Sequence, residues 1–380
     1  MSAATTTIDR KVPLLNLRAL HAPFREEILT EITRVVDSSS FIMGEDVKLL
    51  ERSIADYCDV PFAISCASGS DALFLATLTA DVKPGDQVIT TPFTFFATGG
   101  AIVRTGAAPV FVDIEPETFN MDAAKLADVL NAHPRVKAIM PVHLFGACAD
   151  MDPINALARE RGCLVIEDGA QAIGAAYKGR RAMSLGDIGC ISFFPSKNLG
   201  GFGDGGMLTT RDESLARRLS ALRLHGAARK YFHDWVGINS RLDTLQAAVL
   251  RVKFKYLDQE TAGRQRNADL YRALLSDAGL PITLPRAAEY QTRHVYNQFV
   301  IRTARRDELK KFLHEHGIGT EVYYPLSLHQ QVCFRELGYC EGDFPASEQA
   351  AREVLALPVH SALSTEDLEY VCQVIQEFWR

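Results

Sequence analysis

Residues 164–171 read LVIEDGAQ, a short apolar run that ends in two carboxylates and a glycine. Similar apolar runs, each bounded by Gly, Pro, Asp or Ser, alternate with amphipathic helical patterns from about residue 46 to 210. The other predicted strands are 62–65, 87–90, 108–112, 138–142 and 188–194, and the helices between them are 71–79, 97–104, 121–131 and 153–161. Such alternation is typical of βα units around a mostly parallel sheet, and continuously apolar strands need cover on both faces. We therefore predict an α/β fold with a doubly wound core.

The second half of the chain has a different pattern. A helical periodicity extends from Leu242 to about Leu275 with only Gly263 interrupting it, and a helix of that length usually bridges two domains. Beyond about Pro281 the pattern predicts a strand at 295–301 and helices at 306–316 and 365–379. We therefore predict N-terminal helices and a large domain in residues 1–250, and a long connecting helix and a smaller α+β domain in residues 251–380. Within the first part, Asp152 and Pro153 are placed as N-cap and first residue of the helix at 153–161.

Composition excludes several classes of protein. The 380 residues are 47% hydrophobic, and 41 Lys and Arg against 47 Asp and Glu leave a net charge of -6 without a basic block, which argues against a nucleic-acid or anionic-membrane partner. The N-terminus has no apolar signal region, and no stretch approaches the ~18 uncharged residues that span a bilayer. The eight cysteines have neither CxxC nor zinc-ligand spacing, so we predict reduced, mostly buried thiols in a cytoplasmic protein.

Candidate functional residues are most concentrated in residues 192–199, SFFPSKNL, and five glycines follow between 200 and 206. Lys197 comes just past a buried strand, at the edge where parallel sheets bind their ligands. Loss of solvent there lowers the basicity of a lysine, and a neutral amine can form a Schiff base with an aldehyde. Taken alone, the segment is equally compatible with a surface lysine that follows a strand.

Two nucleotide-binding motifs are similar to this segment. Residues 201–206, GFGDGG, fit GxGxxG but lead into a strand pattern at 207–210, whereas a dinucleotide fingerprint opens a helix. Lys197 precedes its glycines, whereas the lysine of a P-loop follows them. This order excludes a P-loop NTPase and leaves a nicotinamide-dependent dehydrogenase as an alternative.

A carboxylate is expected beside Lys197. Because side chains alternate along a strand, only one of Glu167 and Asp168 faces a given side, and Asp168 at the carboxyl end would point into the crevice of Lys197. A carboxylate near a protonated pyridine nitrogen keeps that ring cationic, which makes the ring an electron sink for carbanion chemistry. The alternative is an Asp that only caps the following turn.

Residues at two further strand ends are suited to bind parts of a ligand. Residues 65–75, SCASGSDALFL, form a strand, a small-residue turn and a helix start, where backbone N–H groups suit a phosphate. Residues 91–97, TPFTFFA, place aromatic rings where one could stack on a flat heterocycle. The alternatives are an ordinary N-cap by Ser68 or Ser70 and plain core aromatics. Together, the amine, carboxylate, phosphate site and aromatic ring indicate a pyridoxal phosphate site. The absence of HExxH and GxSxG motifs argues against a metal site and a serine hydrolase.

From about Pro13 to the C-terminus the sequence resembles the DegT/DnrJ/EryC1/StrS family of sugar aminotransferases. The resemblance rests on EDGAQAIGA at 167–175, SFFPSKNLGGFGDGG at 192–206, GINSRLDTLQAAVL at 237–250 and YYPLSLHQQ at 323–331. It implies the type I aminotransferase fold of pyridoxal-phosphate-dependent transferases, with a seven-stranded mixed, mostly parallel sheet in the large cofactor-binding domain and a smaller C-terminal domain. It also implies a homodimer with shared active sites.

The resemblance further implies roles for individual residues. Lys197 would form the Schiff base with pyridoxal phosphate, Asp168 would face the pyridine nitrogen, and Gln171 would contact the ring hydroxyl. Phe95 would stack on the ring. The phosphate would be held by Gly69, Ser70, Asp71 and Ser192.

Three more residues are carried over from the family. Asn239 would reach the phosphate from the partner subunit, and Arg241 and His329 match positions that contact the nucleotide sugar. The structural alternatives are that Asn239 and Arg241 cap the helix that follows them, and that His329 is a surface histidine with its hydrogen bonds satisfied.

The activity implied by the resemblance is transamination, because Lys197 is present where a dehydratase branch has histidine. L-glutamate would be the amino donor, pyridoxamine phosphate the aminated cofactor, and a nucleoside-diphosphate keto-sugar the acceptor. The residues in these motifs favour amination at C3 of a UDP-linked 3-keto-N-acetylhexosamine or hexuronate, or of a dTDP-linked 3-keto-6-deoxyhexose. The alternatives are a C4-specific aminotransferase and a catalytically idle regulator that binds the cofactor or the sugar nucleotide.

Overall fold

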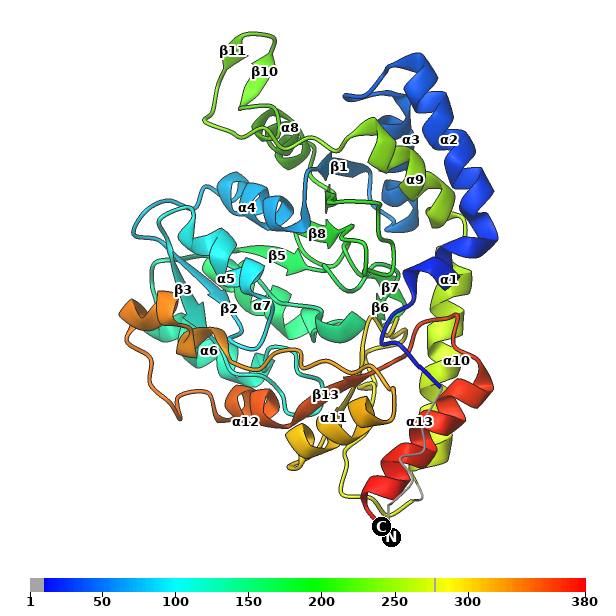
Figure 1. Cartoon of the computed structure of the whole chain (residues 1–380). Coiled ribbons are helices and arrows are strands. Elements are labelled where there is room, and N and C mark those ends of the chain that lie inside the picture. The colour runs from blue at the N-terminus through cyan, green and yellow to red at the C-terminus, as the bar shows by residue number, and fades with distance from the viewer. Residues whose placement is uncertain (1–9, 277) are drawn as a thin grey trace.

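A seven-stranded sheet organises the larger part of the computed structural model, which describes residues 10–276 and 278–380 (Figure 1). The strand order is β1-β9-β8-β5-β4-β2-β3. β9 is antiparallel to both of its neighbours, whereas the remaining neighbouring pairs are parallel. The strands are β1 Phe62–Cys66, β2 Gln87–Thr90, β3 Ala108–Phe111, β4 Val136–Ile139, β5 Leu164–Asp168, β8 Ile188–Ser192 and β9 Gly206–Thr210. The predicted mixed, mostly parallel sheet is confirmed.

Helices cover both faces of this sheet, as its apolar strands predict. On β5, Val165 belongs to the core beneath one set of helices and Ile166 to the core beneath the other, because neighbouring side chains on a strand point to opposite faces. The first set is α3 Glu45–Tyr57, α6 Ala123–Ala132, α7 Met151–Arg161 and α9 Thr244–Phe254. The second set is α4 Gly69–Thr79, α5 Phe96–Val103 and α8 Glu213–Leu222. The doubly wound core is therefore confirmed.

The long helix predicted from Leu242 to Leu275 is wrong in one respect. It is two helices, α9 and α10 Leu257–Leu275, with a break at Lys255 and Tyr256 rather than at Gly263. At the break the ring of Tyr256 stacks on Phe24, with centroids 4.9 Å apart, and the Tyr256 hydroxyl donates to Glu27 at 3.1 Å. Phe24 lies between helix α1 Leu17–His21 and helix α2 Arg25–Ser38, and Glu27 lies in α2, so local periodicity does not reveal this contact.

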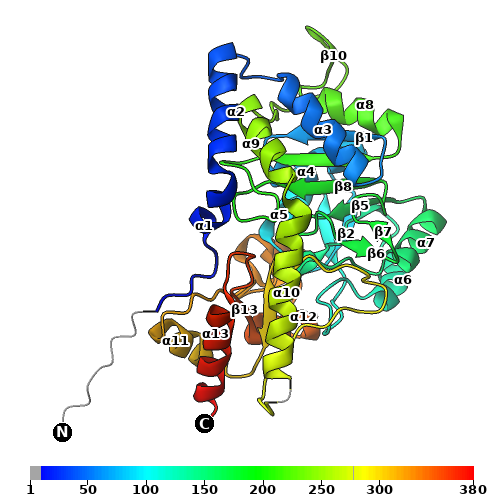
Figure 2. The same cartoon turned by 90° about the vertical axis from the view of Figure 1, so that its right-hand side faces the viewer.

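The C-terminal part has a core of its own. A two-stranded antiparallel sheet packs with four helices, and Figure 2 shows α10 and α13 lying side by side. The elements are β12 Phe299–Arg302, β13 Val354–Leu357, α11 Arg306–Glu315, α12 Pro345–Glu353 and α13 Thr365–Phe378. The division into residues 1–250 and 251–380 stays a prediction.

Two predicted boundaries shift because of contacts made over long distances in the chain. Helix α7 begins at Met151 with Asp150 as N-cap, instead of beginning at Pro153 with Asp152 as N-cap. The Tyr177 hydroxyl donates to the Asp150 carboxylate at 2.5 Å and accepts the Asp152 N–H at 3.1 Å, so a distant side chain replaces the local cap. The strand expected at 295–301 is shortened to β12, because Val295 N–H donates to Gly146 and Gln298 N–H donates to Phe145.

Two short hairpins complete the fold. β6 Ala176–Tyr177 pairs with β7 Arg180–Arg181, and β10 Ala227–Arg229 pairs with β11 Phe232–His233. The second hairpin extends away from the sheet domain beyond α8 (Figure 1). Within the described residues, no helix combines the length and the apolarity that a membrane crossing requires.

Candidate active site

Lys197 and Asp168 are brought together at one edge of the sheet. Asp168 is the last residue of β5, and Lys197 follows the end of the neighbouring parallel strand β8, in a turn closed by a hydrogen bond from its N–H to the Phe194 carbonyl. Burial lowers the pKa of Lys197 to about 8, and the negative charge of Asp168 acts in the opposite direction. A substantial fraction of this amine is therefore neutral near pH 8.

The Asp168 carboxylate is buried and hydrogen-bonded to helix α5. It accepts from the Thr98 hydroxyl at 2.7 Å and from the Ala170 N–H at 3.3 Å. Burial raises the pKa of Asp168, while the hydrogen bond from Thr98 and the charge of Lys197 lower it. The side chain is thus held in one orientation close to the amine of Lys197.

Glu167 points to the other side of the strand, as alternation predicts. Its carboxylate lies 2.9 Å from His143 Nε2 and accepts the backbone N–H groups of Met183, Leu185 and Gly186 at 2.8 Å. The backbone N–H of His143 donates to the backbone carbonyl of Asp168 at 2.9 Å, so the residue that faces Glu167 also helps to fix the backbone at Asp168.

The residues predicted to bind a phosphate lie where α4 begins. The Ser68 hydroxyl accepts the Asp71 N–H at 3.0 Å and is the N-cap, as one alternative for this segment has it. Gly69 packs so closely on β8 that a Cβ there would lie 2.6 Å from Ser192 Cβ. This close approach sets the first turn of α4 directly against the Ser192 hydroxyl, and a helix start beside a hydroxyl suits a phosphate group.

The other residues predicted to contact the cofactor lie along the same edge. Phe95 precedes α5 and is 57% exposed, so a ring face is available for stacking. The Gln171 side chain accepts the Phe145 N–H at 2.7 Å and donates to the Tyr324 hydroxyl at 3.3 Å. Tyr324 belongs to the C-terminal part and lies 6.1 Å from Phe95 between ring centroids, so both parts of the chain contribute to this edge.

Among the described residues, no hydrogen bond or ion pair links the predicted site residues at this edge to Asn239, Arg241 or His329. Asn239 is exposed and Arg241 half-buried. His329 is only 3% exposed, with Nε2 3.1 Å from a Glu348 carboxylate oxygen, so the alternative of a surface histidine is wrong.

Sequence reasoning missed two residues that hold the site together. Thr98 stands one helical turn after Phe95, and that spacing alone could have pointed to it. Tyr324 lies in the YYPLSLHQQ motif, but its contact with Gln171 depends on the packing of the C-terminal part against the sheet.

The glycine segment excludes a dinucleotide site. Gly206 is the first residue of β9, so the GxGxxG match leads into a strand, and the dehydrogenase alternative is wrong. The glycines instead permit close packing, since a Cβ at Gly200 would lie 2.3 Å from the Pro195 carbonyl oxygen.

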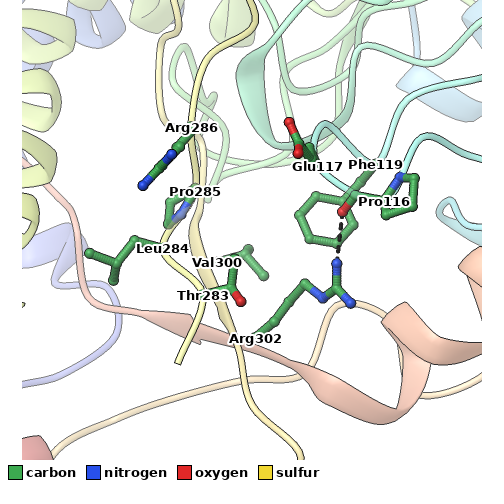
Figure 3. Close-up of a pocket in the computed structure, with 9 residues that line it drawn as sticks. All are labelled: Pro116, Glu117, Phe119, Thr283, Leu284, Pro285, Arg286, Val300 and Arg302. Carbon is green, nitrogen blue, oxygen red and sulfur yellow. Dashed lines mark hydrogen bonds between the residues drawn. The ribbon is translucent and has the colours of Figure 1, made fainter. Parts of the chain in front are cut away.

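The cavity in Figure 3 lies apart from these residues. It has a volume of about 290 Å³, and none of its nine lining residues is a predicted site residue. Phe119 and Val300 give it apolar surface, and Arg302 spans it by donating to the Pro116 carbonyl at 2.9 Å. It is a crevice between the sheet domain and β12.

Comparison with known proteins identifies the family. The model of the DegT/DnrJ/EryC1/StrS aminotransferase family matches residues 23–376. The chain belongs to this family. Its fold class and its activity class, aminotransferase, are as the sequence predicts.

Individual members of the DegT/DnrJ/EryC1/StrS family match along nearly their whole length. A UDP-N-acetyl-3-dehydro-alpha-D-glucosamine 3-aminotransferase of Acidithiobacillus ferrooxidans is 45% identical over 97% of this chain and 98% of its own. A pleiotropic regulatory protein of Geobacillus stearothermophilus is 48% identical over 97% of this chain and 99% of its own. The crystal structure of S. venezuelae DesV in complex with a ketimine intermediate superposes with a TM-score of 0.93 at 39% identity, covering 97% of this chain and 98% of DesV.

Proposed function

We propose that this protein is a pyridoxal-phosphate-dependent aminotransferase that transfers the amino group of L-glutamate to the C3 keto group of a nucleoside-diphosphate sugar. Pyridoxamine phosphate would carry the amino group between the two half-reactions. The observation that carries the proposal is the pairing of a buried lysine, whose pKa is lowered to about 8, with a buried carboxylate at adjacent strand ends.

The residues at this edge fit the cofactor. When bound, pyridoxal phosphate supplies an aldehyde and a ring that withdraws electrons from the α-carbon of an amino donor. In this proposal Ser192 and the start of α4 bind the phosphate, Phe95 orients the ring, and Asp168 keeps a proton on the ring nitrogen. The Lys197 Nζ, when neutral, can accept a proton from the donor α-carbon and deliver it to the cofactor carbon next to the ring, on the other side of the nitrogen.

The names of the relatives support the choice of acceptor. The Acidithiobacillus protein is named for amination at C3 of a UDP-linked N-acetylated sugar, which supports a UDP-3-keto-N-acetylhexosamine or the corresponding hexuronate here. A dTDP-linked 3-keto-6-deoxyhexose is the competing acceptor, and a C4 keto-sugar is the competing regiochemistry. Arg241 and His329 are proposed to act on the nucleotide sugar, with the burial of His329 requiring a rearrangement for direct contact.

The proposal is tested by an absorbance titration of the purified protein with pyridoxal phosphate and then with L-glutamate. We expect the cofactor band to shift on glutamate addition in the wild type and not in Lys197→Ala. Subsequent addition of 3-keto and 4-keto nucleotide sugars should restore the first band only with the true acceptor. A Lys197→Ala variant that responds to glutamate as the wild type does would overturn the proposal.

A regulatory role is the second candidate, because the Geobacillus relative at 48% identity is named a regulatory protein. An idle regulator would bind pyridoxal phosphate but leave its band unchanged with glutamate and with every other amino acid. The same titration therefore separates the two functions.

The partner of this chain in the proposal is a second copy. The exposure of Asn239 supports a role toward a neighbouring subunit, and the long apolar side chains exposed near the sheet edge, Phe194 and Phe202, would gain cover there. All eight cysteines are free thiols and six of them are buried, which agrees with the cytoplasmic location that the sequence predicts.

A further inference from the structure

A chain of two threonine hydroxyls ends on the Asp168 carboxylate. The Thr94 hydroxyl lies 2.9 Å from the Thr98 hydroxyl, and the Thr98 hydroxyl donates to Asp168 Oδ2 at 2.7 Å. Thr94 and Thr98 are both buried, and they flank Phe95 on a single turn at the start of α5. The same turn of the chain therefore carries the Phe95 ring and donates a hydrogen bond to the Asp168 carboxylate.

The direction of this chain is fixed when Asp168 is ionised. A hydroxyl has one hydrogen, and Thr98 uses its hydrogen on the carboxylate, which has none to give. Thr94 must then donate to Thr98. Both hydroxyl dipoles point toward Asp168, and they stabilise its negative charge in a buried site.

Other groups around Asp168 do not replace this hydrogen bond. Lys197 contributes a positive charge, and the side chain of His143 is engaged with Glu167. The Tyr324 hydroxyl accepts from Gln171 and forms no hydrogen bond with the Asp168 carboxylate. Cys190, opposite Asp168 on β8, is a buried thiol whose own pKa is raised. Among the residues that the structure describes, the carboxylate accepts only from Thr98 and, at 3.3 Å, from the Ala170 N–H.

We propose that Thr98, backed by Thr94, is a positioning residue that keeps Asp168 a weak base and aims it at the cofactor ring nitrogen. The inference rests on the proposed function, in which Asp168 shares a proton with that nitrogen. The proton stays on the nitrogen only while the carboxylate is the weaker base of the two. Removing the Thr98 hydroxyl makes a desolvated Asp168 more basic, so the proton moves to the carboxyl and the ring loses its positive charge.

The test replaces Thr98 by Val, which keeps the shape of the side chain and removes the hydroxyl. We expect the rate of the glutamate half-reaction to fall about ten- to a hundred-fold, since a hydrogen bond to a charged group is lost, and the acid limb of its pH profile to move to higher pH. Thr98→Ser, which restores the hydroxyl, should recover most of the rate. Thr77→Val is the matched control, because Thr77 is an equally buried helical threonine whose hydroxyl donates to the Leu73 carbonyl, away from the site.

A second readout is independent of turnover. Protein is reconstituted with pyridoxal phosphate carrying ¹⁵N in the ring, and the nitrogen chemical shift reports whether the ring is protonated. We expect a protonated ring in the wild type, Thr98→Ser and Thr77→Val, and a wholly or partly deprotonated ring in Thr98→Val. If Thr98→Val does not fold, Thr94→Val carries the same test, with a shift in the same direction and a rate loss of several fold.

The outcomes separate the inference from the proposed function. A wild type that ignores glutamate contradicts the proposed function, whereas the ring-nitrogen shift can still be read. A Thr98→Val enzyme with a fully protonated ring and a rate within about twofold of the wild type would overturn the inference alone.

Discussion

Glu167 and Asp168 are neighbours in sequence and both are buried, yet their surroundings give them different chemistry. Glu167 accepts three backbone N–H groups and faces His143, so its charge is compensated within the protein. Asp168 has fewer donors and faces Lys197. A buried carboxylate with spare acceptor capacity can hold a ligand proton, whereas one that is fully hydrogen-bonded serves the fold.

Gly69→Ala is predicted to destabilise the apo-protein. In an open helix the exchange would gain about 1 kcal/mol, but here the new Cβ meets Ser192 Cβ at 2.6 Å. We expect a net loss of about 1–3 kcal/mol in the free energy of unfolding, measured in urea. The double variant with Ser192→Gly removes the opposing Cβ and should recover much of the loss. Equal stability of Gly69→Ala and the wild type would show that the cradle is looser than its geometry indicates.

The reaction of Lys197 with pyridoxal phosphate is predicted to depend on pH. Its amine must be neutral to attack an aldehyde, so the rate of binding to the apo-protein should rise with pH and level off above about 8. The charge of Asp168 favours the ammonium form, and Asp168→Asn should therefore lower the midpoint by about half to one pH unit. Stopped-flow absorbance measures the rate. Asp81→Asn, a change in a surface ion pair, is the control, and a midpoint that is the same in both variants would contradict the prediction.

At the scale of elements, the break between α9 and α10 lets one helix pack on the sheet and the other on the C-terminal core. Residues at the break use i to i−3 hydrogen bonds, from Lys255 N–H to Val252 and from Tyr256 N–H to Lys253. The tightened turn brings Tyr256 against Phe24. The chain therefore changes direction where an aromatic contact from the N-terminal helices fixes it.

Tyr256→Ala is predicted to reduce the free energy of unfolding by about 1–3 kcal/mol, because the stacked ring and its packing are lost. Tyr256→Phe keeps the ring and loses only the hydrogen bond to Glu27, so it should cost no more than about 1 kcal/mol. Urea unfolding of both variants gives the comparison. If the alanine variant is as stable as the phenylalanine variant, the stacked ring does not hold the break.

At the scale of the whole molecule, the proposed active site needs two copies of the chain. Lys197 belongs to one subunit and Asn239 is proposed to come from the other. Lys197→Ala and Asn239→Asp should each be nearly inactive alone. After the two variants are unfolded and refolded together, each mixed dimer contains one intact site, so about a quarter of wild-type activity should return.

Mixed dimers also test the alternative arrangement. If Asn239 served the site of its own subunit, both sites of a mixed dimer would be defective and no activity would return. Size-exclusion chromatography of the refolded mixture confirms that dimers have formed before the assay is interpreted.

The sequence by itself determined the class of the fold and predicted most residues of the candidate site. Apolar runs fixed the strands, because a strand buried on both faces tolerates few polar side chains, and the turns after them fixed the sheet edge that carries Lys197 and Asp168. The alternation of side chains along β5 was enough to predict that Asp168 and Glu167 point to opposite sides of the strand. These features depend on residues that are close together in the chain, so local pattern reveals them.

Only the tertiary structure decided the features that join distant segments. Phe24 breaks the long helix at Tyr256, Tyr177 caps α7 through Asp150, and the C-terminal Tyr324 holds Gln171. The burial of His329 against Glu348 and the hydrogen bond from Thr98 to Asp168 also join distant segments of the chain. Each depends on packing that brings together side chains from separate elements, and a hydrogen bond or a stacked ring of that kind leaves no periodic signal in the sequence.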